Sequence, residues 1–144
     1  MKIDIVKLRP TAVLPKYQTA GAAGADIHAC IDASITLQPL ERRMIPTGIS
    51  MAIPVGYEVQ IRARSGMSIK HGITMVNGIG TIDADYRGEV GVLAINLSQE
   101  AFTIEPGMRI AQMVVAKYET IGWNKVDVLD ETDRGVGGYG SSGN

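Results

Sequence analysis

The stretch Tyr57-Glu58-Val59-Gln60-Ile61-Arg62-Ala63 decides the fold class, because apolar and polar residues alternate along it without a break. A period of two is typical of a β-strand with one face in the core and the other in solvent. Two further segments, residues 90–95 and 110–116, are almost wholly apolar. They predict strands that are buried on both faces.

Turn sequences separate these apolar runs and leave little room for helices. Glycine accounts for 17 of the 144 residues, about 12%, against about 7% in an average protein. Only residues 65–70 predict a short helical turn, with Ser65 as its N-cap. The pattern therefore predicts an all-β, jelly-roll-like sandwich or barrel with one short helix. The turn sequences are Gln38-Pro39, Pro46-Thr47-Gly48, Pro54-Val55-Gly56, Asn77-Gly78 and Pro106-Gly107.

Composition excludes several classes of function. The 14 basic and 15 acidic residues give a net charge of -1, whereas a nucleic-acid-binding domain usually carries a basic excess. Cys30 is the single cysteine, so neither a disulfide framework nor a cysteine-rich zinc site can form. His28 and His71 are the only histidines, which excludes a three-histidine metal site. Charged residues at the N-terminus and the absence of long apolar runs argue against a signal peptide or a membrane span. We expect a cytoplasmic protein, or one of another reducing compartment such as the nucleus, with no nucleic-acid or membrane partner.

Residues 134–144 form a glycine-rich tail that differs from the β domain predicted over residues 1–133. Its five glycines allow successive main-chain N–H groups to face one concavity, and Arg134 and two serines add donors for phosphate oxygens. A disordered terminal linker is the alternative, but a linker needs neither Arg134 nor Tyr139.

Two internal segments also carry groups suited to a nucleotide. Arg64-Ser65-Gly66 opens the predicted helical turn, where main-chain N–H groups bind anions; solvated arginines and a capping serine are the alternative. Residues 77–89 predict a hairpin with Asp83, Asp85 and Tyr86 at its tip. Such a tip can hydrogen-bond a base, hold a water and stack on a sugar, or it can be an ordinary polar turn.

Two shorter segments complete the set. Asp26 follows small residues, and Arg109-Ile110-Ala111-Gln112 places a cation and an amide on one strand. Together the five segments resemble, in order, the five motifs of the trimeric deoxyuridine triphosphatases (dUTPases). Two positions depart from the family pattern: Ala63, where many members have proline, and Tyr139, where phenylalanine is usual. The segments are residues 23–27, 64–73, 77–89, 109–112 and 134–143.

The resemblance implies a jelly-roll homotrimer whose active sites are shared between subunits. The implied reaction is Mg²⁺-dependent hydrolysis of dUTP to dUMP and pyrophosphate, with water attacking the α-phosphate. Such a reaction removes dUTP from the nucleotide pool and supplies dUMP for thymidylate synthesis.

The resemblance also implies a role for each matching residue. Asp83 activates the attacking water, and Asp26 holds a magnesium-bound water in the outer shell. Tyr86 stacks on the deoxyribose and excludes a 2′-hydroxyl. The remaining assignments are Arg64, Ser65, Gly66 and Gln112 for phosphate, Asn77 with the main chain at Gly80 and Ile82 for uracil, and Arg134, Tyr139, Gly140, Ser141 and Ser142 for a flap that closes over the nucleotide.

Three alternatives remain open at this stage. A dCTP deaminase shares the family fold, although Asp83 and Tyr86 disfavour it. A non-enzymatic jelly-roll binding module would release no pyrophosphate and would not need Asp83. A structural trimer, such as a decoration protein of a capsid, would leave the ordered tail motif unexplained.

Overall fold

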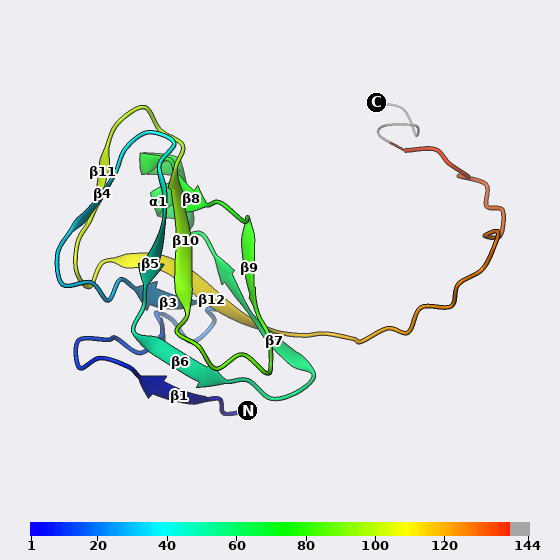
Figure 1. Ribbon diagram of the computed structural model, residues 1–144, viewed down its shortest axis with the longest axis horizontal. Helices are drawn as coiled ribbons and strands as arrows, with labels where there is room; N and C mark the ends of the chain where they lie inside the picture. The colour runs from blue at the N-terminus through cyan, green and yellow to red at the C-terminus, as the bar shows by residue number, and fades with distance from the viewer. Residues whose placement is uncertain (139–144) are drawn as a thin grey trace.

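The structure is a computed structural model that describes residues 1–138, and within them the chain forms twelve strands and one helix (Figure 1). The elements are β1 (Asp4–Lys7), β2 (Lys16–Tyr17), β3 (Ala25–His28), β4 (Ile35–Leu37), β5 (Arg42–Pro46), β6 (Ile49–Ala52), β7 (Tyr57–Arg62), α1 (Ser65–His71), β8 (Ile73–Met75), β9 (Ile79–Ile82), β10 (Gly91–Asn96), β11 (Phe102–Ile104) and β12 (Arg109–Lys117).

All of the strand pairs are antiparallel. The largest sheet has the order β2-β3-β12-β7-β9, and a three-stranded sheet has the order β5-β10-β8. The remaining strands form two two-stranded sheets, β1-β6 and β11-β4. Neighbours in each sheet are mostly distant in sequence, as expected for a jelly roll. The predicted all-β, jelly-roll-like fold with one short helix is confirmed.

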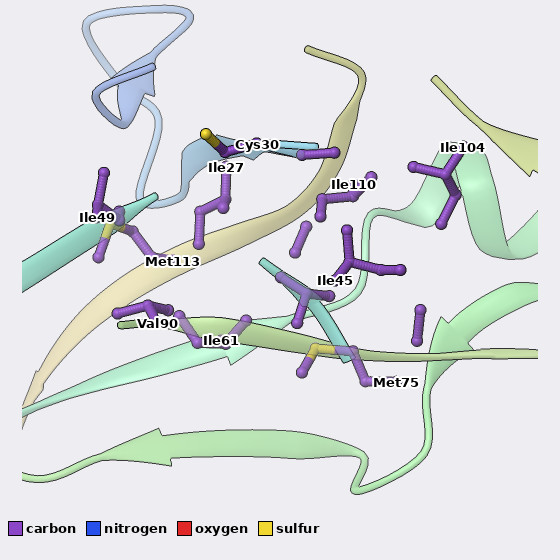
Figure 2. Close-up of a cluster of buried hydrophobic side chains, with 14 of the residues drawn as sticks. Ile27, Cys30, Ile45, Ile49, Ile61, Met75, Val90, Ile104, Ile110 and Met113 are labelled. Carbon is purple, nitrogen blue, oxygen red and sulfur yellow. The ribbon is translucent and has the colours of Figure 1, made fainter. Parts of the chain in front are cut away.

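One apolar core lies between the sheets (Figure 2). Val59 and Ile61 of β7 are almost completely buried, whereas the residues between and beside them are more exposed. The alternation in residues 57–63 therefore marks the inner face of the large sheet. The prediction that residues 90–95 are buried on both faces is wrong, because Leu93 is 36% exposed while its neighbours Val92 and Ala94 are buried. The sheet that contains β10 has only one face on the core.

Glycines form the predicted turns where the backbone needs a positive φ. Gly48, Gly56, Gly78 and Gly107 have φ values of 68°, 88°, 69° and 76°. In this left-handed region glycine lacks the steric penalty of other residues. The predicted turn positions are therefore correct at these four sites.

Two local predictions about the segments around α1 are wrong. The hairpin predicted over residues 77–89, with its tip at residues 83–86, does not form, because β9 before the tip pairs with β7 whereas β10 after it pairs with β5 and β8. The Asn77-Gly78 turn leads from β8 to β9. The turn instead carries the chain from one sheet to the other. Ser65 is the first helical residue and not the N-cap; Arg64 occupies the cap position without a side-chain capping hydrogen bond.

Residues 118–138 leave the barrel after β12 and contain no helix or strand (Figure 1). Tyr118 is still tied to the barrel, since its N–H donates to the carbonyl of Gly56 at 3.2 Å. Beyond it, the side chains of Trp123 and Leu129 are exposed. Within residues 1–138 the only helix has seven residues, and no helix there has the length and apolarity to cross a membrane.

A buried asparagine ties β10 to the loop that follows it. Asn96 is fully buried; its Nδ2 donates to the carbonyls of Leu37 at 3.0 Å and Glu100 at 2.7 Å, and its Oδ1 accepts from the Ser98 N–H at 2.9 Å. Asn96→Leu removes all of these partners at once. We expect the free energy of unfolding to fall by about 2–5 kcal/mol, because each buried polar group left without a partner costs roughly 1–3 kcal/mol.

Denaturant unfolding followed by circular dichroism measures this change. Gln99→Ala is the matched control, because Gln99 is exposed in the same loop. Equal stability of Asn96→Leu and the wild-type protein would show that the asparagine does not hold the loop.

Candidate active site

A buried carboxylate lies between two arginines at one end of the large sheet. Asp26 Oδ1 accepts from Arg64 Nε at 3.2 Å, and Oδ2 accepts from Arg109 Nη1 at 3.1 Å. Arg64 Nη1 also donates to the main-chain carbonyl of Arg109 at 3.1 Å. These bonds join β3, β12 and the residue before α1. Two guanidinium groups compensate a carboxylate that burial would otherwise disfavour.

This arrangement carries an excess positive charge of one, which suits an anion. His28 lies two residues further along β3, opposite Arg109. Burial lowers the pKa of His28; the Asp26 carboxylate acts in the opposite direction, and Arg109 and Arg64 act in the same direction as burial. His28 is therefore neutral near pH 7, and the positive charge belongs to the arginines.

Gln112 completes what we call the arginine cluster: Asp26, Arg64, Arg109 and Gln112. Gln112 lies on β12 opposite Asp26, and its Nε2 donates to the carbonyl of Ala63 at 3.0 Å. A Cβ on Gly24 would collide with Gln112 Oε1. Glycine at position 24 is therefore what allows the amide to lie beside Asp26.

Ser65 and Gly66 follow the arginine cluster directly as the first two residues of α1. Both are exposed. The first turn of a helix leaves main-chain N–H groups without intrahelical partners. The hydroxyl of Ser65 and these N–H groups can therefore donate to an anion held by Arg64.

A separate pocket of about 250 Å³ lies beside β9, the edge strand of the large sheet. All five residues that the sequence assigns to the nucleoside and the attacking water line it. An edge strand leaves half of its main-chain N–H and C=O groups unpaired in the sheet. We call this the β9 pocket; it is lined by Met44, Ile61, Met75, Asn77, Gly80, Thr81, Ile82, Asp83, Tyr86, Glu89, Gly91 and Leu93.

Gly80 keeps the β9 pocket open beside Asn77. A Cβ on Gly80 would lie 3.3 Å from Asn77 Nδ2 and 3.4 Å from Ile61 Cβ. A side chain at position 80 would press on the asparagine amide and on the core. Small size at this position therefore leaves the amide and the main chain of β9 available to a ligand.

Asp83 lies at the far end of the β9 pocket from Asn77 and also lines a cavity of about 620 Å³ on its other side. Glu58, Asp85 and Arg87 line this larger cavity as well. The other predicted nucleoside-binding residues do not line it. The smaller β9 pocket is therefore where polar main chain, an amide and an aromatic ring converge.

Asp83 and the arginine cluster lie far apart within one chain. The register of β7 and β9 pairs Val59 with Ile82, which puts Asp83 level with Glu58. Arg64 follows six residues later along β7 and its extension. At about 3.3 Å per residue this separation is roughly 20 Å. Figure 1 agrees, with α1 at one end of the barrel and the chain after β9 at the other.

Arg134, the first residue of the predicted flap, lies in the segment that leaves the barrel. Its Nε donates to the carbonyl of Gly137 at 2.9 Å, and its side chain forms no ion pair within residues 1–138. Tyr139, Gly140, Ser141 and Ser142 lie outside the described residues. The structure thus gathers four of the five motifs into two groups, three in the arginine cluster and one at the β9 pocket, and leaves the tail apart.

Two residues at these groups were not among the predicted site residues. Arg109 belongs to segment 109–112, and its cationic side chain on the same strand as Gln112 was a signal that could have identified it. Glu89 lines the β9 pocket and pairs with Arg9 at 3.6 Å. Eighty residues separate this pair, so no local pattern could have revealed it.

No group of three or more His, Cys, Asp and Glu side chains suited to a metal ion occurs within residues 1–138. Asp26 alone would not hold a metal, since arginines occupy both of its oxygens. Each carboxylate oxygen has a second lone pair, however, and can accept from a metal-bound water. The residues present therefore fit an ion that is held mainly by the ligand's phosphates, as Mg²⁺ often is.

Comparison with known proteins follows the same segments. The dUTPase family model matches residues 11–143. The chain is 55% identical over 143 residues to a deoxyuridine 5′-triphosphate nucleotidohydrolase of Finegoldia magna, covering 99% of each chain. It is 60% identical over 131 residues to the protein of the same name from Roseobacter denitrificans, covering 90% of this chain and 86% of the other.

Solved structures give the same result for the fold. The dUTPase of Staphylococcus bacteriophage 80alpha with dUPNHPP superposes with a TM-score of 0.88 at 28% identity, covering 99% of this chain and 98% of the other. The family match spans nearly the whole chain and includes all five motifs. The chain belongs to the dUTPase family.

Proposed function

We propose that the protein hydrolyses dUTP to dUMP and pyrophosphate. One observation carries the proposal: Asn77, Gly80, Ile82, Asp83 and Tyr86 line a single pocket in a chain whose relatives at more than 50% identity are named for this reaction. Release of pyrophosphate from dUTP, dTTP, dCTP and UTP, with and without Mg²⁺, tests it. Rapid release from dUTP alone is expected, whereas formation of uracil nucleotide from dCTP would identify a deaminase.

Asp83 is the general base. Its exposed carboxylate takes a proton from a water molecule while the water oxygen bonds to the α-phosphorus. The bond from that phosphorus to the oxygen bridging the α- and β-phosphates breaks, and pyrophosphate leaves with its electron pair. A positioned base contributes about 10²–10⁴ in rate, and donors on the leaving pyrophosphate stabilise its growing charge.

Uracil is selected by hydrogen bonding along the edge of β9. Uracil presents an N3–H donor beside carbonyl acceptors, and cytosine reverses this pattern. The amide of Asn77 and the main chain of Gly80 and Ile82 match uracil and leave cytosine's groups unpaired. Sites that hydrogen-bond a substrate group reject analogues lacking it by large factors. Tyr86 lies against the deoxyribose and occupies the space of a 2′-hydroxyl.

The phosphates bind Arg64, Ser65, Gly66 and Gln112 of the arginine cluster and the start of α1. Mg²⁺, when bound, neutralises phosphate charge, and Asp26 accepts a hydrogen bond from one of its waters. Because roughly 20 Å separates Arg64 from Asp83 within one chain, the two groups that serve one nucleotide come from different subunits of a homotrimer. Arg134 and the flap residues Tyr139, Gly140, Ser141 and Ser142 close over the γ-phosphate and the base from a further copy.

Asp83→Asn should abolish turnover and keep nucleotide binding. The amide still accepts a hydrogen bond from water but cannot take its proton, so kcat should fall by at least about 100-fold. Stopped-flow release of pyrophosphate measures turnover, and calorimetry with a non-hydrolysable analogue measures binding. Asp85→Asn is the matched control, because Asp85 lies two residues away and does not line the β9 pocket. Asp83→Asn activity above about a tenth of wild type would exclude the general-base role.

Mixed subunits test whether sites are shared. Asp83→Asn and Arg134→Ala chains should each be nearly inactive alone. After denaturation and refolding together, some sites combine an intact Asp83 with an intact Arg134 from another subunit, and part of the activity returns. Mass spectrometry of the mixed trimers verifies the exchange. Verified mixing without any recovery would mean that each site takes both residues from one chain.

Truncation after Asp133 tests the flap. Arg134 makes no described contact with the barrel, so the shortened chain should fold and assemble with nearly unchanged thermal stability. Turnover should fall by much more, because the donors to the γ-phosphate and the aromatic ring are gone. Melting temperature, light scattering and kcat/KM are measured on one preparation. Unchanged turnover, or an unfolded chain, would restore the interpretation of residues 134–144 as a linker or a structural strand.

A further inference from the structure

We propose that Glu89, anchored by Gly48 and Arg9, is a positioning residue that holds Tyr86 in place and so sets the discrimination between deoxyribose and ribose. This inference rests on the proposed function, since it concerns the sugar of the same substrate. It assigns to Glu89 a role that none of the five motif assignments above includes.

Tyr86 depends directly on the main chain of residues 88 and 89. Its hydroxyl donates to the Glu89 carbonyl at 3.0 Å. A Cβ on Gly88 would collide with the Tyr86 hydroxyl and lie 2.5 Å from the ring carbon Cζ. The phenol therefore folds back over Gly88, and a shift of residue 89 moves the ring with it.

The Glu89 side chain is held by a separate and rigid part of the barrel. Its Oε1 accepts the Gly48 N–H at 2.7 Å. Gly48 has a φ of 68°, and a Cβ there would lie 2.6 Å from the Cys30 sulfur and 2.7 Å from Ala12 Cβ. The donor to Glu89 is thus fixed by close packing on both sides.

Arg9 supplies a second, weaker anchor. Its Nη2 lies 3.6 Å from Glu89 Oε2, and its Nη1 donates to the Cys30 carbonyl at 2.9 Å. The two side chains are 38% and 30% exposed, and exposed ion pairs contribute little. The main-chain hydrogen bond to Gly48 is therefore the principal anchor, and Arg9 orients the carboxylate.

Neighbouring hydrogen bonds hold residues 87 and 90 but do not involve residue 89. Ser50 Oγ donates to the Arg87 carbonyl at 2.6 Å, and the Val90 N–H donates to the Ile49 carbonyl at 2.9 Å. Residues 87 and 90 are thus attached to β6 through their own main-chain groups. Residue 89 makes two other contacts. Its carboxylate accepts a hydrogen bond from the barrel at Gly48, and its carbonyl accepts one from Tyr86.

Both Glu89 and Tyr86 line the β9 pocket, so a shift of either residue changes the shape of the pocket in which we propose that the sugar binds. Exclusion of a 2′-hydroxyl depends on the distance between a ring and one oxygen atom. A misplacement of about 1 Å can change a rate by as much as ~100-fold. Loosening Glu89 should therefore change sugar discrimination before it changes the chemistry at Asp83.

The test compares kcat/KM for UTP and dUTP in the full-length protein. Glu89→Ala removes both anchors and should raise the UTP-to-dUTP ratio at least roughly threefold, with kcat on dUTP nearly kept. Glu89→Gln retains an oxygen that accepts the Gly48 N–H, so it should stay close to wild type. An unchanged ratio in Glu89→Ala, or equal changes in both variants, would overturn the main-chain anchor.

Glu41→Ala is the matched control. Glu41 likewise accepts a main-chain N–H, from Gln38 at 2.9 Å, and pairs with an arginine, Arg43 at 2.8 Å, but it does not line the β9 pocket. It should change stability by a similar amount and leave the ratio unchanged. A similar change of the ratio in Glu41→Ala would show that Glu89 acts only through general stability.

A double-mutant cycle with Tyr86→Phe separates positioning from other effects. Phenylalanine lacks the hydroxyl that bonds the Glu89 carbonyl, so Glu89→Ala should add less to the ratio in that background than alone. Full additivity would mean that Glu89 does not act through Tyr86.

Amide hydrogen exchange distinguishes failure of this inference from failure of the proposed function. Glu89→Ala should speed exchange of the main-chain N–H groups of Gly48 and Tyr86, which Glu41→Ala should not. A wild-type protein that does not hydrolyse dUTP would remove the proposed function and the sugar role together. Slow exchange unaffected by Glu89→Ala would remove the positioning role alone.

Discussion

The carboxylate of Asp26 is the group on which the arginine cluster, the proposed phosphate site, depends. It is buried, and it joins the guanidinium groups of Arg64 and Arg109, which would otherwise repel each other. Removing either arginine would leave the buried carboxylate with only one cationic partner, which destabilises the folded state. The arginines are therefore held in place before any ligand arrives, and their net positive charge needs little reorganisation when it meets a phosphate.

The large sheet constrains how the two halves of the site can meet. Residues 62 and 79 are opposite each other in the β7-β9 ladder, and so are residues 59 and 82. The chain leaves β7 toward Arg64 at one end, and it leaves β9 toward Asp83 at the other. Antiparallel pairing alone thus separates the phosphate donors from the proposed base. No side-chain rotation can close roughly 20 Å, and this separation is the reason for proposing that a second copy completes the site.

Local patterns predicted the parts of the fold that local chemistry determines. A strand over residues 57–63 and turns at glycines 48, 56, 78 and 107 could be predicted from the sequence. Side-chain period and positive φ are properties of a few neighbouring residues. Pairing is not local: Asn77-Gly78 predicted a turn correctly, but the hairpin predicted over residues 77–89 was wrong, since β9 and β10 pair in different sheets. The five-motif resemblance supplied the site residues, but the Arg9–Glu89 contact joins residues far apart in sequence and only the fold reveals it.

The segment after β12 connects the barrel to the proposed flap. In a single copy Trp123 is 89% exposed and Val128 83% exposed, although aromatic and branched side chains gain about 1.5–3 kcal/mol each on burial. The barrel of the same chain lies away from this segment (Figure 1), so in the proposed trimer a second copy would be the surface that buries them. The same stretch leads to Arg134 and the proposed flap. Burial of these apolar side chains in the proposed trimer would therefore deliver the γ-phosphate donors to a neighbouring site, and a lone subunit would lack both the packing and the complete active site.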